Sequence, residues 1–166
     1  MPDQALVVID IQNDITPHYR DIVDALNAAV DWAAGRGMEV VYITHHDLSP
    51  GDHGFRPGTR GAELAPELKR VSDHIFVKTA EDALTSRDFT AFIREKKLRE
   101  FWVTGADASA CVKATCRSMR EAGYTVHVIS DCVACYEPGL IPEMLNSYAA
   151  AGCEVQPLHA YLTRTE

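Results

Sequence analysis

Apolar runs typical of buried β-strands alternate with amphipathic helical segments along the whole chain, and this alternation most constrains the fold. The first run, residues 5–10 (ALVVID), is apolar until it ends in an acid. Strands buried on both faces of a parallel sheet have this pattern. Further strands are expected over 39–44, 74–79, 101–104, 124–129 and, at the sheet edge, 154–158. The pattern predicts an α/β fold for a single domain, 1–166: a Rossmann-like, three-layer αβα sandwich with a six-stranded parallel sheet.

Helices are expected between these strands, where apolar residues recur at helical spacing. Ser86 is a candidate N-cap for a helix that carries Phe89, Phe92 and Ile93 on one face. The remaining expected helices are 21–36, a short one over 63–71, 109–123 with Val112, Cys116 and Met119 inward, and a final one carrying Ile141, Met144, Leu145 and Tyr148.

Three chemically active side chains stand at or just past the ends of expected strands. Asp10 ends the first strand, Lys78 ends the third, and Cys111 follows the fourth at the start of a helix. Right-handed crossovers place the carboxyl ends of parallel strands on one rim, where ligands bind in this architecture. The sequence therefore predicts that Asp10, Lys78 and Cys111 converge.

The three residue types suit nucleophilic catalysis. A cysteine thiol has a pKa near ~8.5 and needs a base and nearby positive charge to become a nucleophile. Asp10 is the candidate base, Lys78 supplies the charge, and a helix start favours a thiolate. Structural alternatives remain open for each residue: Cys111 as a small core residue, Asp10 as the cap of a turn, and Lys78 as a solvated side chain.

Composition limits the classes of partner that we expect for this chain. A net charge of −8 without a basic stripe argues against nucleic acid as a partner. No apolar run approaches the ~20 residues that span a membrane, and the N-terminus lacks the features of a secretory signal. Five cysteines without framework spacing favour reduced thiols and a cytoplasmic location. Cys132 and Cys135 match C-x-x-C, but no second pair or zinc-spaced histidine supports a metal or redox role.

Several motifs together resemble the isochorismatase-like cysteine hydrolase family. They are VVIDIQND at 7–14, GTRGAEL at 58–64, the VK that ends at Lys78, VTGADASACV at 103–112, and VISDCVA at 128–134. The resemblance covers nearly the whole chain. It implies a six-stranded parallel sheet, hydrolysis of C–N bonds in small amides, ureides or carbamoyl compounds, and a catalytic triad of Asp10, Lys78 and Cys111. It also implies a homo-oligomer, either a dimer or a tetramer.

The resemblance implies a thioester mechanism as well. Asp10 would deprotonate Cys111, and the thiolate would attack the substrate carbonyl. The backbone N–H groups of Asp107 and Cys111 would form the oxyanion hole, where each donor is typically worth roughly 3–4 kcal/mol. The family also places a non-proline cis peptide bond in this loop, here between Ala106 and Asp107.

The loop at 45–61 departs from the pattern of metal-binding relatives. Nicotinamidases of this family hold a metal through Asp-x-His and a later histidine, whereas this chain has Ser49 two residues after Asp47. The Trp-Pro-x-His segment is also missing. The loop retains His45, His46, Asp52 and His53, which leaves recruitment of other ligands open. We expect no metal and no cofactor, and a substrate-facing loop or lid.

The substrate-binding side chains are predicted less sharply. Asp82-Ala-Leu84 replaces the Ser-Ala-Phe that helps to line the pocket in the family, so another wall is needed. Candidate wall or substrate-binding residues are Gln12, His18, Tyr19, His46, Phe55 and Tyr136. Arg56, Arg60 and Arg87 are candidates for pairing with a substrate carboxylate, although each is equally compatible with a solvated surface position.

Other functions remain alternatives at this stage. A catalytically idle binding or assembly module would need no triad. A nucleotide-binding protein would need a Gly-rich phosphate loop, and no G-x-G-x-x-G or P-loop follows any expected strand. Isochorismatase activity does without the cysteine nucleophile, and nicotinamidase activity is weakened by the altered metal segment. Cys111 therefore favours a metal-independent cysteine amidohydrolase acting on a small molecule.

Overall fold

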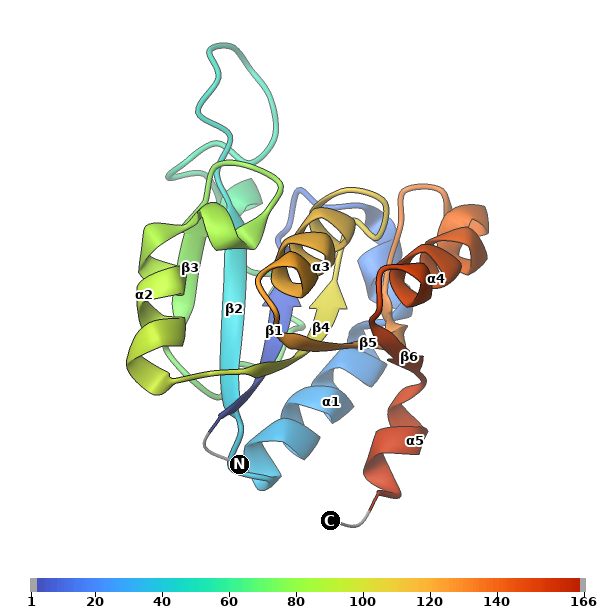
Figure 1. Ribbon diagram of the computed structural model, residues 1–166. Coiled ribbons are helices and arrows are strands. Elements are labelled where there is room, and N and C mark those ends of the chain that lie inside the picture. Colours follow the sequence, from blue (N-terminus) through green and yellow to red (C-terminus); the bar gives the residue numbers. More distant parts are fainter. Residues whose placement is uncertain (1–2, 165–166) are drawn as a thin grey trace.

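A computed structural model describes residues 3–164 and contains one parallel sheet of six strands (Figure 1). The strands lie in the order β3-β2-β1-β4-β5-β6. Their bounds are β1 Gln4–Ile9, β2 Glu39–His45, β3 Ile75–Lys78, β4 Glu100–Gly105, β5 Thr125–Val133 and β6 Glu154–Gln156. Every neighbouring pair runs parallel, which confirms the predicted sheet, and β6 lies at an edge as expected.

Helices cover both faces of the sheet, as the alternating pattern predicted. Ala5, Val7 and Ile9 of β1 belong to the core beneath α2, α3 and α4, whereas Leu6 and Val8 belong to the core beneath α1 and α5. The helices are α1 Val23–Gly35, α2 Arg87–Lys96, α3 Cys111–Glu121, α4 Ile141–Ala150 and α5 Leu158–Leu162. The αβα sandwich is therefore confirmed, because successive side chains of a strand point to opposite faces.

The order of the strands creates a crevice between β1 and β4. From β1 the chain builds β2 and β3 on one side, then returns to place β4 against the other side of β1. The loops that leave these two central strands consequently run in opposite directions, and such a switch point is where ligands bind in open α/β sheets. Asp10 follows β1 and residues 106–110 follow β4, so both lie at this crevice.

Local signals predicted the start of α2 and the inward face of α3 correctly. The Ser86 hydroxyl accepts a hydrogen bond from the Phe89 N–H at 3.3 Å, as an N-cap does. Helix α1 ends at Gly35, two residues before Gly37 with its φ of 73°. The residues predicted to face inward on α3, Val112, Cys116 and Met119, are fully buried.

Three predicted elements differ from the structure. Residues 63–71 form no helix, because the Ala65 N–H donates to the Ile11 carbonyl and Pro66 cannot donate at all. Strand β5 runs beyond the expected residue 129 to Val133. The expected edge strand ends at Gln156, and residues 158–162 form the short helix α5 instead.

A long loop, residues 46–59, rises beyond the carboxyl rim of the sheet (Figure 1). Three hydrogen bonds to residues 12–14 hold this loop. The Gln12 amide donates to the Ala62 carbonyl, the Asn13 amide donates to the Arg60 carbonyl, and the Asp14 carboxylate accepts from the Phe55 N–H. A Cβ at Gly61 would lie 2.0 Å from the Asp14 carboxylate, so this contact requires glycine. The projecting loop is therefore tied down at its base.

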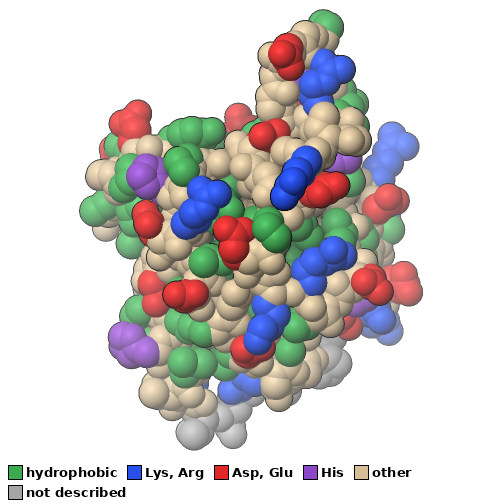
Figure 2. All heavy atoms as spheres, turned by 180° about the vertical axis from the view of Figure 1, so that it is seen from behind, with side chains coloured by type: hydrophobic (Ala, Val, Ile, Leu, Met, Phe, Trp, Pro, Cys, Tyr) green, Lys and Arg blue, Asp and Glu red, His purple; other side chains and the backbone are tan. Residues whose placement is uncertain are grey.

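The surface charges and the unpaired cysteines agree with what the composition led us to expect. Figure 2 shows acidic and basic side chains interspersed over the face seen from behind. No helix within residues 3–164 is long and apolar enough to cross a membrane. All five cysteines are unpaired, and Cys132 and Cys135 belong to the cores on opposite faces of the sheet. The C-x-x-C spacing therefore forms no joint site.

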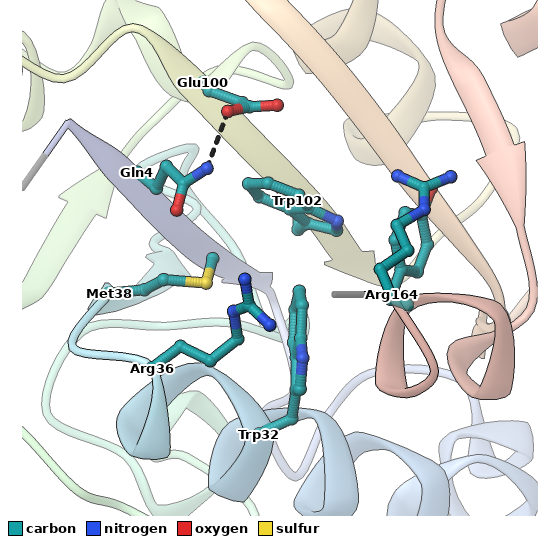
Figure 3. Close-up of a pocket in the computed structure, with 8 residues that line it drawn as sticks. Gln4, Trp32, Arg36, Met38, Glu100, Trp102 and Arg164 are labelled. Carbon is teal, nitrogen blue, oxygen red and sulfur yellow. Dashed lines mark hydrogen bonds between the residues drawn. The ribbon is translucent and has the colours of Figure 1, made fainter. Parts of the chain in front are cut away.

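A small cavity of about 80 Å³ lies at the other end of the sheet from the carboxyl rim (Figure 3). Gln4 and Glu100, the first residues of β1 and β4, line it together with the Trp32 and Trp102 rings. These two indoles pack edge to face with centroids 5.5 Å apart. Because no triad residue lines this hollow, we assign it to the aromatic packing beneath α1 and α5 and not to catalysis.

Candidate active site

Asp10 stands directly after β1 in a left-handed backbone conformation, with a φ of 56°. Its N–H donates to the Ile43 carbonyl at 2.9 Å, and the residue is only 1% exposed. Oδ2 accepts a hydrogen bond from Lys78 Nζ at 3.0 Å, whereas the buried Oδ1 has no hydrogen-bond partner in residues 3–164. Burial raises the pKa of Asp10, and the Lys78 charge and the Cys111 thiol oppose that rise.

Lys78 ends β3 and is buried, with its Nζ surrounded by three hydrogen-bonding atoms. These are Asp10 Oδ2 at 3.0 Å, His45 Nδ1 at 3.0 Å and Cys111 Sγ at 3.3 Å. An ammonium group has three N–H donors and no acceptor, so one N–H is available for each contact. The predicted triad residues therefore lie together, joined through Lys78, and the solvated alternative for Lys78 does not apply.

Cys111 is the first residue of α3 and is half-buried. Burial and the negative charge of Asp10 raise the pKa of the thiol to about 12, although the Lys78 ammonium favours the thiolate. Both effects favour the protonated thiol over the thiolate. We expected the helix start to favour a thiolate, but burial and the adjacent carboxylate outweigh that effect.

The loop between β4 and Cys111 contains a cis peptide bond between Ala106 and Asp107, at the position that the resemblance implied. The loop approaches β1 closely, since a Cβ on Gly105 would lie 2.1 Å from the Ile9 carbonyl oxygen. Within residues 3–164, the backbone N–H groups of Asp107 and Cys111 have no hydrogen-bond acceptor. These two donors are therefore available to a ligand, as an oxyanion hole requires.

The carboxylate of Asp107 anchors this loop. Its Oδ1 accepts from the Ser109 N–H at 2.8 Å and the Ser109 hydroxyl at 2.7 Å, and it also receives the Cys135 thiol at 3.3 Å. Its Oδ2 accepts from the Tyr136 N–H at 2.8 Å. Burial alone would raise the pKa of Asp107, but the hydrogen bonds hold it below the usual value. Sequence reasoning assigned Asp107 only its backbone N–H.

Two of the predicted substrate-binding residues have other roles. Gln12 is fully buried, and its side-chain amide bonds to the backbone of His45 and Ala62. Tyr19 packs in the core beneath α1 and its hydroxyl donates to the Glu67 carboxylate at 3.2 Å. Both were expected to contact the substrate. Their polar atoms instead form hydrogen bonds within the protein, so both side chains have a structural role.

The other predicted wall residues surround the rim without forming one continuous surface. The Phe55 ring packs edge to face on His45 with centroids 5.6 Å apart, while His46 lines a separate hollow at the β2–β3 edge. Tyr136 is 60% exposed beside Asp107. His18 lines a cavity of about 160 Å³ together with Cys135 and Ile141, among others. The arginines expected at a substrate carboxylate, Arg56, Arg60 and Arg87, are exposed.

His45 is the site residue that sequence reasoning missed, having considered it only as a possible metal ligand. The strand register could have identified it. His45 ends β2 and lies directly opposite Lys78 on β3, so the two side chains emerge at the same height of the rim.

The residues retained in the long loop do not form a metal site. Among residues 3–164 there is no group of three or more His, Cys, Asp or Glu side chains arranged to hold a metal ion. The Asp47 carboxylate accepts from Ser49 and lies 3.6 Å from His53 Nδ1. His45 Nδ1 already faces Lys78. The expectation of metal-free chemistry stays a prediction.

Comparison with solved structures supports the fold. The chain superposes on an isochorismatase-like hydrolase from Alkaliphilus metalliredigens with a TM-score of 0.87, covering 96% of this chain and 97% of the other at 22% identity. At this identity the likeness shows a shared fold.

Sequence comparison gives the family. The chain is 29% identical to the uncharacterized isochorismatase family protein YddQ of Bacillus subtilis, over 78% of this chain and 77% of YddQ. It is 26% identical to the nicotinamidase of Escherichia coli, over 79% of this chain and 83% of that enzyme. Residues 4–159 match the family model of the isochorismatase domain. This chain therefore belongs to the isochorismatase family of hydrolases.

Proposed function

We propose that this protein is a metal-independent cysteine hydrolase that cleaves the C–N bond of a small amide, ureide or carbamoyl compound through a thioester intermediate. One observation carries the proposal: buried Lys78 Nζ lies within hydrogen-bond distance of both Asp10 Oδ2 and Cys111 Sγ at the crevice between β1 and β4. The nicotinamidase name of a relative supports an amide substrate class.

The first half of the reaction forms the thioester. Asp10 takes the proton from the Cys111 thiol, and Sγ attacks the substrate carbonyl carbon. The developing oxyanion accepts hydrogen bonds from the N–H groups of Asp107 and Cys111, where each donor contributes about 3 kcal/mol in comparable sites. The tetrahedral intermediate collapses, the C–N bond breaks, and Asp10 returns the proton to the departing nitrogen.

The second half consumes water. Asp10 removes a proton from water, whose oxygen attacks the thioester carbonyl, and the C–S bond breaks. The thiol is restored with the proton held by Asp10, leaving a carboxylic or carbamic acid as the other product. Throughout, the Lys78 ammonium offsets the negative charge that moves between Asp10 and Cys111. The raised pKa of the thiol fits this scheme, since a thiol that stays protonated at rest needs a neighbouring base.

Cell location and assembly complete the proposal. Five unpaired cysteines, one of them the nucleophile, suit a reducing compartment, and we place the enzyme in the cytoplasm. We expect a homodimer or homotetramer, as the family resemblance implied, and light scattering of the purified protein measures this directly. The partner is a small molecule, with neither nucleic acid nor membrane involved.

A screen of small amides and ureides for ammonia release tests the activity. Wild-type protein should release ammonia from at least one compound, and Cys111→Ala should abolish that release. Cys132→Ala is the matched control, because Cys132 packs in the core on the opposite face of the sheet from Cys111 and should leave the turnover intact. Undiminished turnover by Cys111→Ala would exclude the cysteine mechanism. No turnover of any compound, together with a Cys111 no more reactive than Cys116, would favour an idle binding module.

A further inference from the structure

Lys78 shares its third N–H with a residue outside the triad. His45 Nδ1 lies 3.0 Å from Lys78 Nζ, as close as Asp10 Oδ2. An ammonium can only donate, so His45 Nδ1 must accept, and the imidazole proton must then reside on Nε2. The contact therefore requires a neutral His45 in one defined tautomer.

The surrounding structure holds the position of the His45 ring. Gln12 clamps the backbone on both sides, since its Oε1 accepts from the His45 N–H at 2.8 Å and its Nε2 donates to the His45 carbonyl at 2.9 Å. The Phe55 ring packs edge to face against the imidazole. Gln12 and Phe55, both expected to bind substrate, thus hold a side chain that bonds to the triad.

The charges around His45 favour the neutral form. Burial and the Lys78 cation lower the pKa of His45, whereas Asp10 and Asp47 oppose this effect. Protonation would remove the acceptor and place a second cation beside Lys78. The neutral acceptor is therefore the form compatible with the observed geometry at neutral pH.

We infer that His45 is a positioning residue, whose neutral Nδ1 accepts the third N–H of Lys78 and thereby orients the ammonium between Asp10 and Cys111. This role rests on the proposed function. Without the acceptor, one N–H of a buried ammonium lacks a partner, and Nζ is free to rotate away from the other two. The effect should fall on the chemical step more than on substrate binding, because His45 acts through Lys78.

Two substitutions separate an acceptor role from a merely structural one. His45→Leu keeps an apolar side chain of similar bulk against Phe55 but removes the acceptor, whereas His45→Asn offers its Oδ1 near the place of Nδ1. The variant loses a hydrogen bond to a charged group. Iodoacetamide should therefore alkylate Cys111 in His45→Leu about 10-fold or more slowly than in wild type. His45→Asn should restore most of the rate. His159→Leu, exposed on α5, is the control that should leave it unchanged.

On a substrate found in the screen, the loss in His45→Leu should appear in kcat, with KM nearly unchanged. Equal rates of alkylation in wild type and a folded His45→Leu would overturn the inference. Nitrogen-15 NMR of the wild-type imidazole gives a test that needs no variant: protonation on Nε2 at neutral pH is expected, and protonation on Nδ1 would overturn it. If Cys111 of the wild type is no more reactive than Cys116, the proposed function is wrong. The NMR measurement would still test the His45 contact separately.

Discussion

The Tyr136 backbone N–H donates to Asp107 Oδ2 at 2.8 Å, joining the loop after β4 to the chain that leaves β5. The same carboxylate receives two hydrogen bonds from Ser109. The residue that presents one N–H of the proposed oxyanion hole is thus held by its own side chain. The geometry of that N–H depends on contacts between two neighbouring strand ends.

Removing the Asp107 carboxylate should consequently impair catalysis. We expect Asp107→Ala to lower kcat by about 10-fold or more, since misplacing an oxyanion-hole donor costs a few kcal/mol. Asp107→Asn should be intermediate, because its amide oxygen still accepts from Ser109 while its NH₂ group faces the Tyr136 N–H. Steady-state kinetics of both variants are compared with Asp73→Ala, a substitution remote from the loop. Wild-type kcat in Asp107→Ala would contradict this prediction.

Gly105→Ala should destabilise the fold severely. The added Cβ would lie 2.1 Å from the Ile9 carbonyl oxygen, and the residue has a φ of 117°. Overpacking against backbone together with backbone strain predicts a loss of about 3 kcal/mol or more in the free energy of unfolding. Gly139→Ala is the control, since a Cβ added there would meet no atom within 4 Å. Denaturant unfolding measures both, and similar midpoints would refute the steric argument.

Asp10 and Lys78 should behave as a coupled buried pair. Asp10→Asn and Lys78→Met each leave an unbalanced buried group, which typically costs about 3–5 kcal/mol. The double variant should lose less stability than the sum of the two single losses, because it leaves neither charge unpaired. A double-mutant cycle from urea unfolding measures the coupling, and strictly additive losses would argue against a buried ion pair.

The kcat for amide hydrolysis should fall in acid as Asp10 becomes protonated. The base must be ionised to accept the thiol proton, and burial raises the pKa of Asp10 above its ordinary value of 3.8. The loss should therefore occur at a higher pH than an ordinary aspartate would give. At neutral pH the rate should depend on Asp10, because the thiol pKa is raised to about 12. Asp10→Asn should hydrolyse substrate slowly throughout the neutral range, and a wild-type kcat in this variant would remove Asp10 as the base.

Purified protein should contain no stoichiometric metal, and chelator should leave activity unchanged. The family resemblance places a metal-binding histidine where this loop has Ser49, and Asp47 is engaged by Ser49 and His53. Elemental analysis of protein prepared without chelator measures this. One zinc per chain, lost together with activity on chelation, would show that the loop rearranges to bind it.

The order of strands and helices, the parallel sheet and the rim on which Asp10, Lys78 and Cys111 meet could all be predicted from the sequence. Hydrophobic periodicity and right-handed crossovers leave few alternatives for such a chain. The family motifs added the oxyanion loop. Periodicity failed at residues 63–71, where the Ala65 N–H bonds to the chain after β1, because a long-range partner outcompeted a local helix.

The pairing of the polar groups, in contrast, follows from the folded arrangement alone. Gln12 and His45 are 33 positions apart, and their mutual hydrogen bonds exist only because β1 and β2 are neighbours. The Asp107 carboxylate likewise finds Tyr136 across two strand ends. The thiol state of Cys111 follows from its burial and from the nearby Asp10 charge, neither of which is written in the residues around it. Hydrogen bonds and electrostatic shifts depend on distances between remote segments, so they emerge only when the chain is folded.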